Sequence, residues 1–286
     1  SSQSRGLGDV YKRQLPSNTA LTIGKKINYS FIKTYNQYTK DKITVVLATK
    51  LVDKIFSKNF FEVKSETELN SFDKNQSKIP FLKFHELLGE DLENINYERI
   101  WDESPLPLDN PENAFRIISG DFVTTEDGTG IVHTAPTFGA DDYKAAKNAN
   151  PEVPPLQVFD KNGNKVPIVD LKGKFIEGIG LVSGKYVKND YYDANSVPEK
   201  SVDVEIAIRL KELNLAFKVE KYSHSYPHCW RTDKPVLYYP MESWFIKMGS
   251  LSNRMFELNK EINWKPKSTG EGLSLIHISE PTRLRR

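Results

Sequence analysis

The sequence predicts a mixed α/β fold that is rich in β-structure, in the form of a β-barrel with peripheral helices. Short runs of β-branched and aromatic residues recur along the chain, and turn residues separate them. The helical patterns between these runs are short and scattered. Closure into a barrel lets many short strands share one core without exposed sheet edges, so these observations together favour that architecture.

The two ends of the chain are encoded by complementary DNA. Residues 9–14 can be encoded by GAT GTG TAT AAG AGA CAG, and the reverse complement of that DNA encodes residues 273–278. Such ends resemble translated sequencing-library adapter. We therefore expect 1–14 and 273–286 to be adapter-like tails that are not native, and 15–272 to be a piece of a longer protein.

Charge and cysteine content narrow the class of protein. Of 40 Lys and Arg and 38 Asp and Glu, the two ends hold six and two, so 34 basic and 36 acidic residues remain between them. A net charge of −2 argues against a global nucleic-acid-binding field. Cys229 is the single cysteine, which excludes an intrachain disulfide and fits a reducing compartment. No apolar run reaches the about 20 residues that span a bilayer, so we expect a cytoplasmic protein.

The first hundred residues contain the clearest strand patterns. Residues 27–35 and 43–48 are rich in β-branched and aromatic residues and predict strands. A short helix is expected at 49–56. The polar stretch 65–78 has no period and predicts a surface loop or a weak helix.

The segment from Phe115 to Thr134 predicts a β-hairpin. An apolar run at 115–123 and a β-branched run at 130–134 flank the turn residues Asp127-Gly128. This pattern is typical of two antiparallel strands that pair with each other.

A helix is expected directly after this hairpin. Pro136 and Gly139 interrupt the chain, and a helical pattern begins at Ala140 with Asp141 and Asp142 in its first turn. A strand end and a helix start therefore bring the His133 imidazole and two carboxylates to one place.

The second half of the chain changes character near residue 200. Turn residues at 160–164 between the short runs 157–159 and 165–168 predict a second hairpin. Residues 201–214 alternate like a strand, yet their length, their Pro-Glu start and one apolar face favour a helix. The following stretch, 222–246, is rich in aromatic residues, so we expect a domain boundary near 200.

Several motifs resemble the editing (CP1) insertion of the class I isoleucyl-tRNA synthetase family. Leu-Pro-Ser-Asn at 15–18 resembles the end of its threonine-rich editing peptide, and 128–143 resembles its second editing motif. The stretches 224–231, 242–246 and 263–272 resemble the return into the Rossmann-type synthetic core. The resemblance implies an editing domain at 15–200 and a partial return segment of the core at 201–272.

Some residues separate this family from its relatives, and some depart from its pattern. Valyl and leucyl enzymes normally lack histidine at the position of His133. Thr137-Phe138 stands where many bacterial members have Gly-His. Thr232 stands where others can have a second cysteine, and Cys229 alone cannot form a tetrahedral zinc site, so no metal is expected. The threonine-rich peptide itself is expected to be replaced by the N-terminal tail.

The resemblance implies roles for three residues. Asp142 matches the residue that binds the α-ammonium group of the aminoacyl ester, and His133 matches a pocket residue that helps to reject a larger side chain. Asn18 matches a polar residue implicated in editing. Thr134 is included as substrate-binding, although packing or local hydrogen bonding is its simplest role. A helix-start carboxylate, a structural histidine and a turn asparagine are the corresponding structural alternatives.

The implied chemistry is hydrolysis of mischarged tRNA. A pocket for isoleucine cannot strongly exclude valine, because one methylene is worth only about 1–3 kcal/mol. We expect a positioned water to hydrolyse Val-tRNA(Ile), assisted by the terminal ribose hydroxyl and by protein dipoles. No Ser-His-Asp set is evident.

The expected partners are the tRNA(Ile) 3′ end carrying valine and the remainder of the synthetase chain, in a monomer. The parent would use ATP and Mg²⁺ to join isoleucine to tRNA. This chain contains neither the His-Ile-Gly-His nor the Lys-Met-Ser-Lys-Ser signature, so no cofactor is expected in it. Two alternatives remain open: a valyl-tRNA synthetase editing domain that deacylates Thr-tRNA, and a catalytically silent tRNA-docking module.

Overall fold

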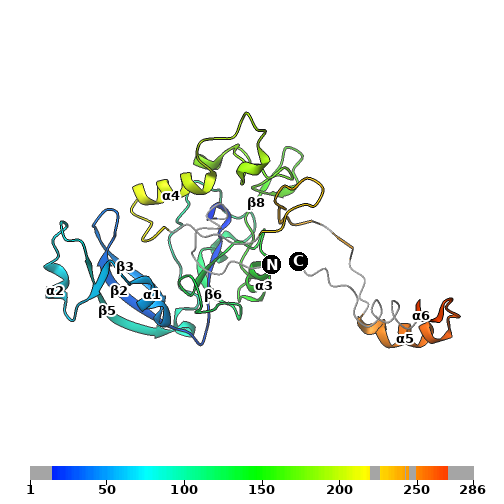
Figure 1. The fold of residues 1–286 in the computed structure, drawn as a ribbon, viewed down its shortest axis with the longest axis horizontal. Coiled ribbons are helices and arrows are strands. Elements are labelled where there is room, and N and C mark those ends of the chain that lie inside the picture. Colours follow the sequence, from blue (N-terminus) through cyan, green and yellow to red (C-terminus); the bar gives the residue numbers. More distant parts are fainter. Residues whose placement is uncertain (1–14, 220–225, 242, 245–248, 270–286) are drawn as a thin grey trace. The chain divides into compact units, whose positions relative to one another are not determined.

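A computed structural model describes residues 15–219, 226–241, 243–244 and 249–269 (Figure 1). The chain divides after Pro240 into two compact units. All of the described strands, together with helices α1 to α4, belong to the larger unit. The adapter-like tails expected at 1–14 and 273–286 lie outside the described residues.

A three-stranded sheet carries the segments that the sequence motifs single out. Its strand order is β6-β1-β7. β1 pairs in parallel with β6 and antiparallel with β7, so Leu21 lies opposite both Ile117 and His133. The strands span Ala20–Ile23 (β1), Arg116–Ser119 (β6) and Ile131–Thr134 (β7).

This strand order corrects the predicted hairpin between 115–123 and 130–134. Both runs form strands, but β1 lies between them and takes the backbone hydrogen bonds of both. The turn segment contacts another part of the chain instead, since the Ala48 N–H donates to the Thr129 carbonyl at 2.8 Å. The loop before β7 is thus hydrogen-bonded to the end of β3 (Lys42–Ala48) and does not pair with β6.

Helix α3 (Ala140–Asn148) covers one face of the three-stranded sheet. Its buried residues Ala145 and Ala146 pack with Ala20 and Ile118. The helix begins where the sequence predicts, after Gly139. Its first turn therefore lies close to the end of β7.

A four-stranded sheet of order β3-β2-β5-β4 forms the N-terminal half of the larger unit. The strands predicted at 27–35 and 43–48 are confirmed, and Figure 1 shows β2, β3 and β5 side by side. Tyr29, Ile32, Phe56 and Phe81 belong to its buried core. The helix predicted at 49–56 is confirmed as a 3-10 turn followed by α1. The elements span Asn28–Tyr35 (β2), Phe60–Glu62 (β4), Ile79–Leu88 (β5), Val52–Ile55 (α1) and Glu66–Asn70 (α2).

A second core surrounds α4 (Val202–Glu212), which confirms the helix predicted over 201–214. Ile206 and Leu210 pack in the same cluster as Leu156 and Phe175. The predicted second hairpin is also confirmed, as the antiparallel pair β8 (Gln157–Phe159) and β9 (Lys165–Pro167). Because α4 shares this core, the larger unit continues past residue 200 to Pro240.

The mixed α/β class is confirmed, but a closed barrel is not. Among the described residues the strands form separate sheets of three, four and two strands. The outer edge of β6 is paired only by an irregular segment, in which the Tyr97 N–H donates to the Phe115 carbonyl at 2.8 Å. Barrel closure requires the last strand to pair with the first at a matching stagger, and none of these sheets does so.

The smaller unit begins at Met241. Its helices are α5 (Ser252–Glu261) and α6 (Lys267–Thr269). The Trp264 indole donates to the side-chain oxygen of Asn259, which is buried, at 3.1 Å. Across the part of the chain that the structure describes, no helix has the length and apolar composition needed to cross a membrane.

Candidate functional site

Asn18 lies just before β1 and connects it to the end of β7. Its amide nitrogen donates to the carbonyl oxygens of Ala20 at 2.7 Å and of Thr134 at 3.3 Å. Its amide oxygen accepts from the Tyr97 hydroxyl at 2.6 Å. Both ends of the amide are therefore bonded within the protein, and in this arrangement Asn18 positions other groups.

Thr134 is fully buried, and its hydroxyl forms a hydrogen bond within the sheet. The hydroxyl oxygen lies 2.5 Å from that of Thr22. The backbone carbonyl of Thr134 accepts from the Asn18 amide at 3.3 Å and from the Thr19 N–H at 3.0 Å. Thr134 thus contributes its main chain to the candidate site.

Asp142 lies in the first turn of α3 and reaches back to the end of β7. Its carboxylate accepts from the Ala135 N–H at 3.0 Å. Burial raises the pKa of this carboxyl from 3.8 to about 6; the Ala135 N–H opposes that shift and Asp141 adds to it. No Lys or Arg among the described residues forms an ion pair with Asp142. The result is a partly buried carboxylate that forms no ion pair within the described residues.

His133 lies on β7 opposite Leu21, on the other face of the sheet from the Thr134 side chain. Its Nε2 atom is buried and has no hydrogen-bond partner among the residues that the structure describes. Burial lowers the pKa of the imidazole to about 4, so the ring is neutral near pH 7. A neutral ring here acts by its shape and its hydrogen-bonding capacity.

Three of the four predicted residues meet at the C-terminal end of β7. Asn18 bonds to the carbonyl of Thr134, and the next N–H along the chain, that of Ala135, bonds to Asp142. Within the described residues no hydrogen bond or ion pair joins His133 to the other three.

Sequence reasoning missed three residues of this region. Tyr97 is 79 residues from Asn18 along the chain, and only the tertiary fold brings their side chains together. Ser17 and Thr19 flank Asn18, and both hydroxyls are buried without a hydrogen-bond partner in the described part of the chain. Their places beside Asn18 were the available signal.

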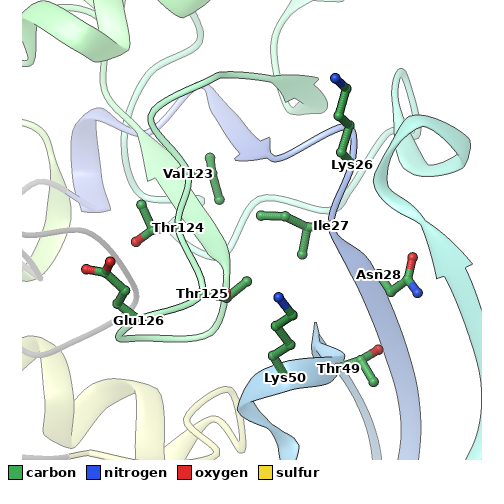
Figure 2. A pocket seen from close by; sticks show the side chains of 9 residues that line it. All are labelled: Lys26, Ile27, Asn28, Thr49, Lys50, Val123, Thr124, Thr125 and Glu126. Carbon is green, nitrogen blue, oxygen red and sulfur yellow. The ribbon is translucent and has the colours of Figure 1, made fainter.

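A cavity of about 470 Å³ lies near the other end of β7, and none of the predicted site residues lines it. Figure 2 shows Lys50, Thr125 and Ile27 pointing toward one another, with Lys26 pointing away from them. No ion pair within the described residues involves Lys26 or Lys50. The complete lining is Lys26, Ile27, Asn28, Thr49, Lys50, Val123, Thr124, Thr125 and Glu126.

The chain is similar in sequence to one region of several isoleucine–tRNA ligases. It is 48% identical over 269 residues to the isoleucine–tRNA ligase of Cytophaga hutchinsonii, and 48% identical over 275 residues to that of Bacteroides fragilis. The ligase of Porphyromonas gingivalis is 44% identical over 277 residues. Each match covers 90% of this chain. The chain is homologous to one region of the isoleucine–tRNA ligases.

This homology confirms the resemblance to the isoleucyl-tRNA synthetase family, which is the same family under another name. The chain spans 23% of the length of these ligases. No family model matches it. In the described residues no group of three or more His, Cys, Asp or Glu side chains is placed to hold a metal ion.

Proposed function

We propose that this region hydrolyses the valyl ester of tRNA(Ile) within an isoleucine–tRNA ligase. The observation that carries the proposal is Asp142, a partly buried carboxylate with a raised pKa and no cationic partner among the described residues. Burying an unpaired charge is costly, so the site favours a ligand that brings a positive charge. The α-ammonium group of an aminoacyl ester is such a ligand.

The carboxylate is mostly ionised at neutral pH because its pKa is about 6. An ammonium group bound to it would form a charge-assisted hydrogen bond and stabilise the ionised form further. His133, neutral and partly buried on β7, would limit the size of the amino-acid side chain. The attacking water would be placed by the terminal ribose hydroxyl and by backbone dipoles.

The remaining parts of the reaction belong to the whole ligase. The relatives span about four times this chain, and they are named as ligases of isoleucine and tRNA. Aminoacylation with ATP and Mg²⁺ is accordingly assigned to parts outside this chain, in a cytoplasmic monomer that acts in protein biosynthesis. Residues 15–200 would form the editing domain, and 201–272 the return segment of the core.

The test is deacylation of Val-tRNA(Ile) by a chain in which residues 1–14 are replaced by the family's threonine-rich segment. Asp142→Ala should slow hydrolysis by at least about 30-fold, the value expected for loss of a charged contact worth about 2 kcal/mol. Asp141→Ala, the matched neighbour, should change it by less than about twofold. Equal hydrolysis by the Asp142→Ala chain and its parent would refute the proposal.

A second candidate function is tRNA docking without hydrolysis. The Lys50 and Thr125 side chains in the cavity of Figure 2 favour it, since an ammonium group and a hydroxyl are suitable ligands for an RNA phosphate. Salt-sensitive tRNA binding that Lys50→Gln weakens, with no deacylation by any chain, would favour docking. Deacylation of Thr-tRNA alone would favour the valyl alternative, although the compared relatives are isoleucine ligases.

A further inference from the structure

We infer that Tyr97 is a positioning residue of this site, which acts through Asn18 and the Thr134–Ala135 backbone to fix the Asp142 carboxylate. Its consequence for hydrolysis rests on the proposed function. The claim that Tyr97 fixes the geometry of the site does not rest on that function, and it can be measured separately.

The first route from Tyr97 to the site runs through side chains. The Tyr97 hydroxyl donates to the Asn18 amide oxygen at 2.6 Å, which turns the amide nitrogen toward the carbonyls of Ala20 and Thr134. Burial raises the pKa of the Tyr97 phenol, so the phenol stays protonated and remains a donor at neutral pH. A rotated Asn18 amide would lose the Thr134 contact.

The second route runs through the main chain. The Tyr97 N–H donates to the Phe115 carbonyl at 2.8 Å, and the Phe115 N–H donates to the Thr19 carbonyl at 2.6 Å. The Thr19 N–H in turn donates to the Thr134 carbonyl at 3.0 Å. Both routes therefore end on the same carbonyl oxygen, one residue before the N–H that holds Asp142.

The backbone of Phe115, which belongs to the second route, is held in an unfavourable conformation by neighbouring side chains. Its φ is 58°, in the left-handed region that a bulky side chain rarely adopts. Its ring packs edge-on against the Tyr97 ring at 6.3 Å, and the Arg99 guanidinium lies 5.3 Å from its centroid. Backbone strain held in place by such contacts is concentrated at functional sites, where it fixes geometry.

Tyr97 contacts the site only through other residues. Its hydroxyl proton is donated to Asn18, so Tyr97 has no hydrogen-bond donor left to offer a substrate. Loss of the hydroxyl should leave the fold intact but loosen the end of β7. The amides that report this are those of Ala135 and Thr19.

The experiment is amide hydrogen exchange on the 286-residue chain. Tyr97→Phe should accelerate exchange at Ala135 and Thr19 by about fivefold, the factor expected for one lost hydrogen bond. The matched control is Tyr35→Phe, which removes a hydroxyl that donates to the Leu69 carbonyl at 3.1 Å in the four-stranded part. The control should leave both amides unchanged.

Asn18→Ala gives an independent measurement. If Tyr97 acts through Asn18, the double variant should exchange at these amides no faster than Asn18→Ala alone. Unchanged exchange in Tyr97→Phe, equal acceleration in Tyr35→Phe, or fully additive effects in the double variant would overturn the inference.

Deacylation distinguishes this inference from the proposed function. With the threonine-rich segment restored, Tyr97→Phe should lower kcat for Val-tRNA(Ile) by about fivefold, while Tyr35→Phe should not. If no chain hydrolyses Val-tRNA(Ile), the proposed function fails. The exchange rates still decide whether Tyr97 positions Asp142.

Discussion

Replacing Asp142 with asparagine should make the folded chain more stable at neutral pH while removing its proposed ligand contact. The pKa of Asp142 is raised from 3.8 to about 6, with burial as the largest cause. The folded chain therefore binds this proton more tightly than the unfolded chain does. Its free energy of unfolding falls as the pH rises from about 4 to about 6, and the loss is complete above that range.

The size of the effect follows from the shift. About two pKa units at 1.36 kcal/mol each amount to about 3 kcal/mol lost between acidic and neutral pH. Asparagine resembles the protonated carboxyl and can still accept from the Ala135 N–H. Asp142→Asn should therefore gain about 3 kcal/mol at pH 7.5 but only about 0.5 kcal/mol at pH 4.

The assay is urea unfolding of both proteins at the two pH values. Trp101, buried in the core with Leu156 and Ile168, is a suitable fluorescence probe. Asp141→Asn is the matched control and should change stability by less than about 0.5 kcal/mol at either pH. An Asp142→Asn chain that is no more stable than its parent at pH 7.5, or that gains equally at pH 4, would refute the assignment of an unpaired carboxylate with a raised pKa.

Three further predictions concern the same strand and its two ends. An alanine Cβ at Gly139 would lie 2.6 Å from the Asp142 carboxyl carbon, so Gly139→Ala should displace that carboxylate and return its pKa toward 3.8; an unchanged carbon-13 titration near pH 6 would contradict this. The ring signals of His133 should titrate with a midpoint near pH 4, because burial disfavours the charged imidazole, and a midpoint near 6.5 would show the ring to be solvated. Gly130 has φ 76°, and an added Cβ would lie 2.5 Å from that of Ala48, so Gly130→Ala should cost about 2 kcal/mol or more in urea unfolding; a smaller loss would mean that the loop can shift.

Elements with a local signal were predicted correctly from the sequence. The turn at 160–164 closes on itself, because the Asp160 carboxylate accepts from the N–H groups of Asn162 and Asn164, each at 2.8 Å. Helix α4 likewise follows from its own apolar face, with Ile206 and Leu210 buried. In both cases the deciding interactions lie within a few residues of one another or on one helix face.

Strand partners could not be predicted in this way. The runs that became β6 and β7 looked like a hairpin because a turn signal stands between them. β1, from the start of the described chain, supplies hydrogen bonds to both, and no short window of sequence contains that information. The predicted barrel depended on the same kind of non-local pairing.

The residues of the candidate site also divide into those with a local sequence signal and those whose contacts depend on the fold. Asp142 and His133 could be proposed as site residues because they stand in one short motif. The hydrogen bonds of Asn18 could not be predicted, because its partner Tyr97 comes close to it only in the folded chain. The buried Thr134 hydroxyl, bonded to Thr22, depended on strand register.

Some of the buried polar side-chain atoms that lack a hydrogen-bond partner lie near Asn18 in the sequence or on β7. Six buried side-chain atoms lack a hydrogen-bond partner among the described residues, and three of them belong to Ser17, Thr19 and His133. Each such group costs about 1–3 kcal/mol, and the buried charge of Asp142 adds to that cost. Side chains that served only to pack β1 against β7 would favour folding more if they were apolar. Under the proposed function, the ammonium group of an aminoacyl ester would supply the cationic partner that Asp142 lacks among the described residues.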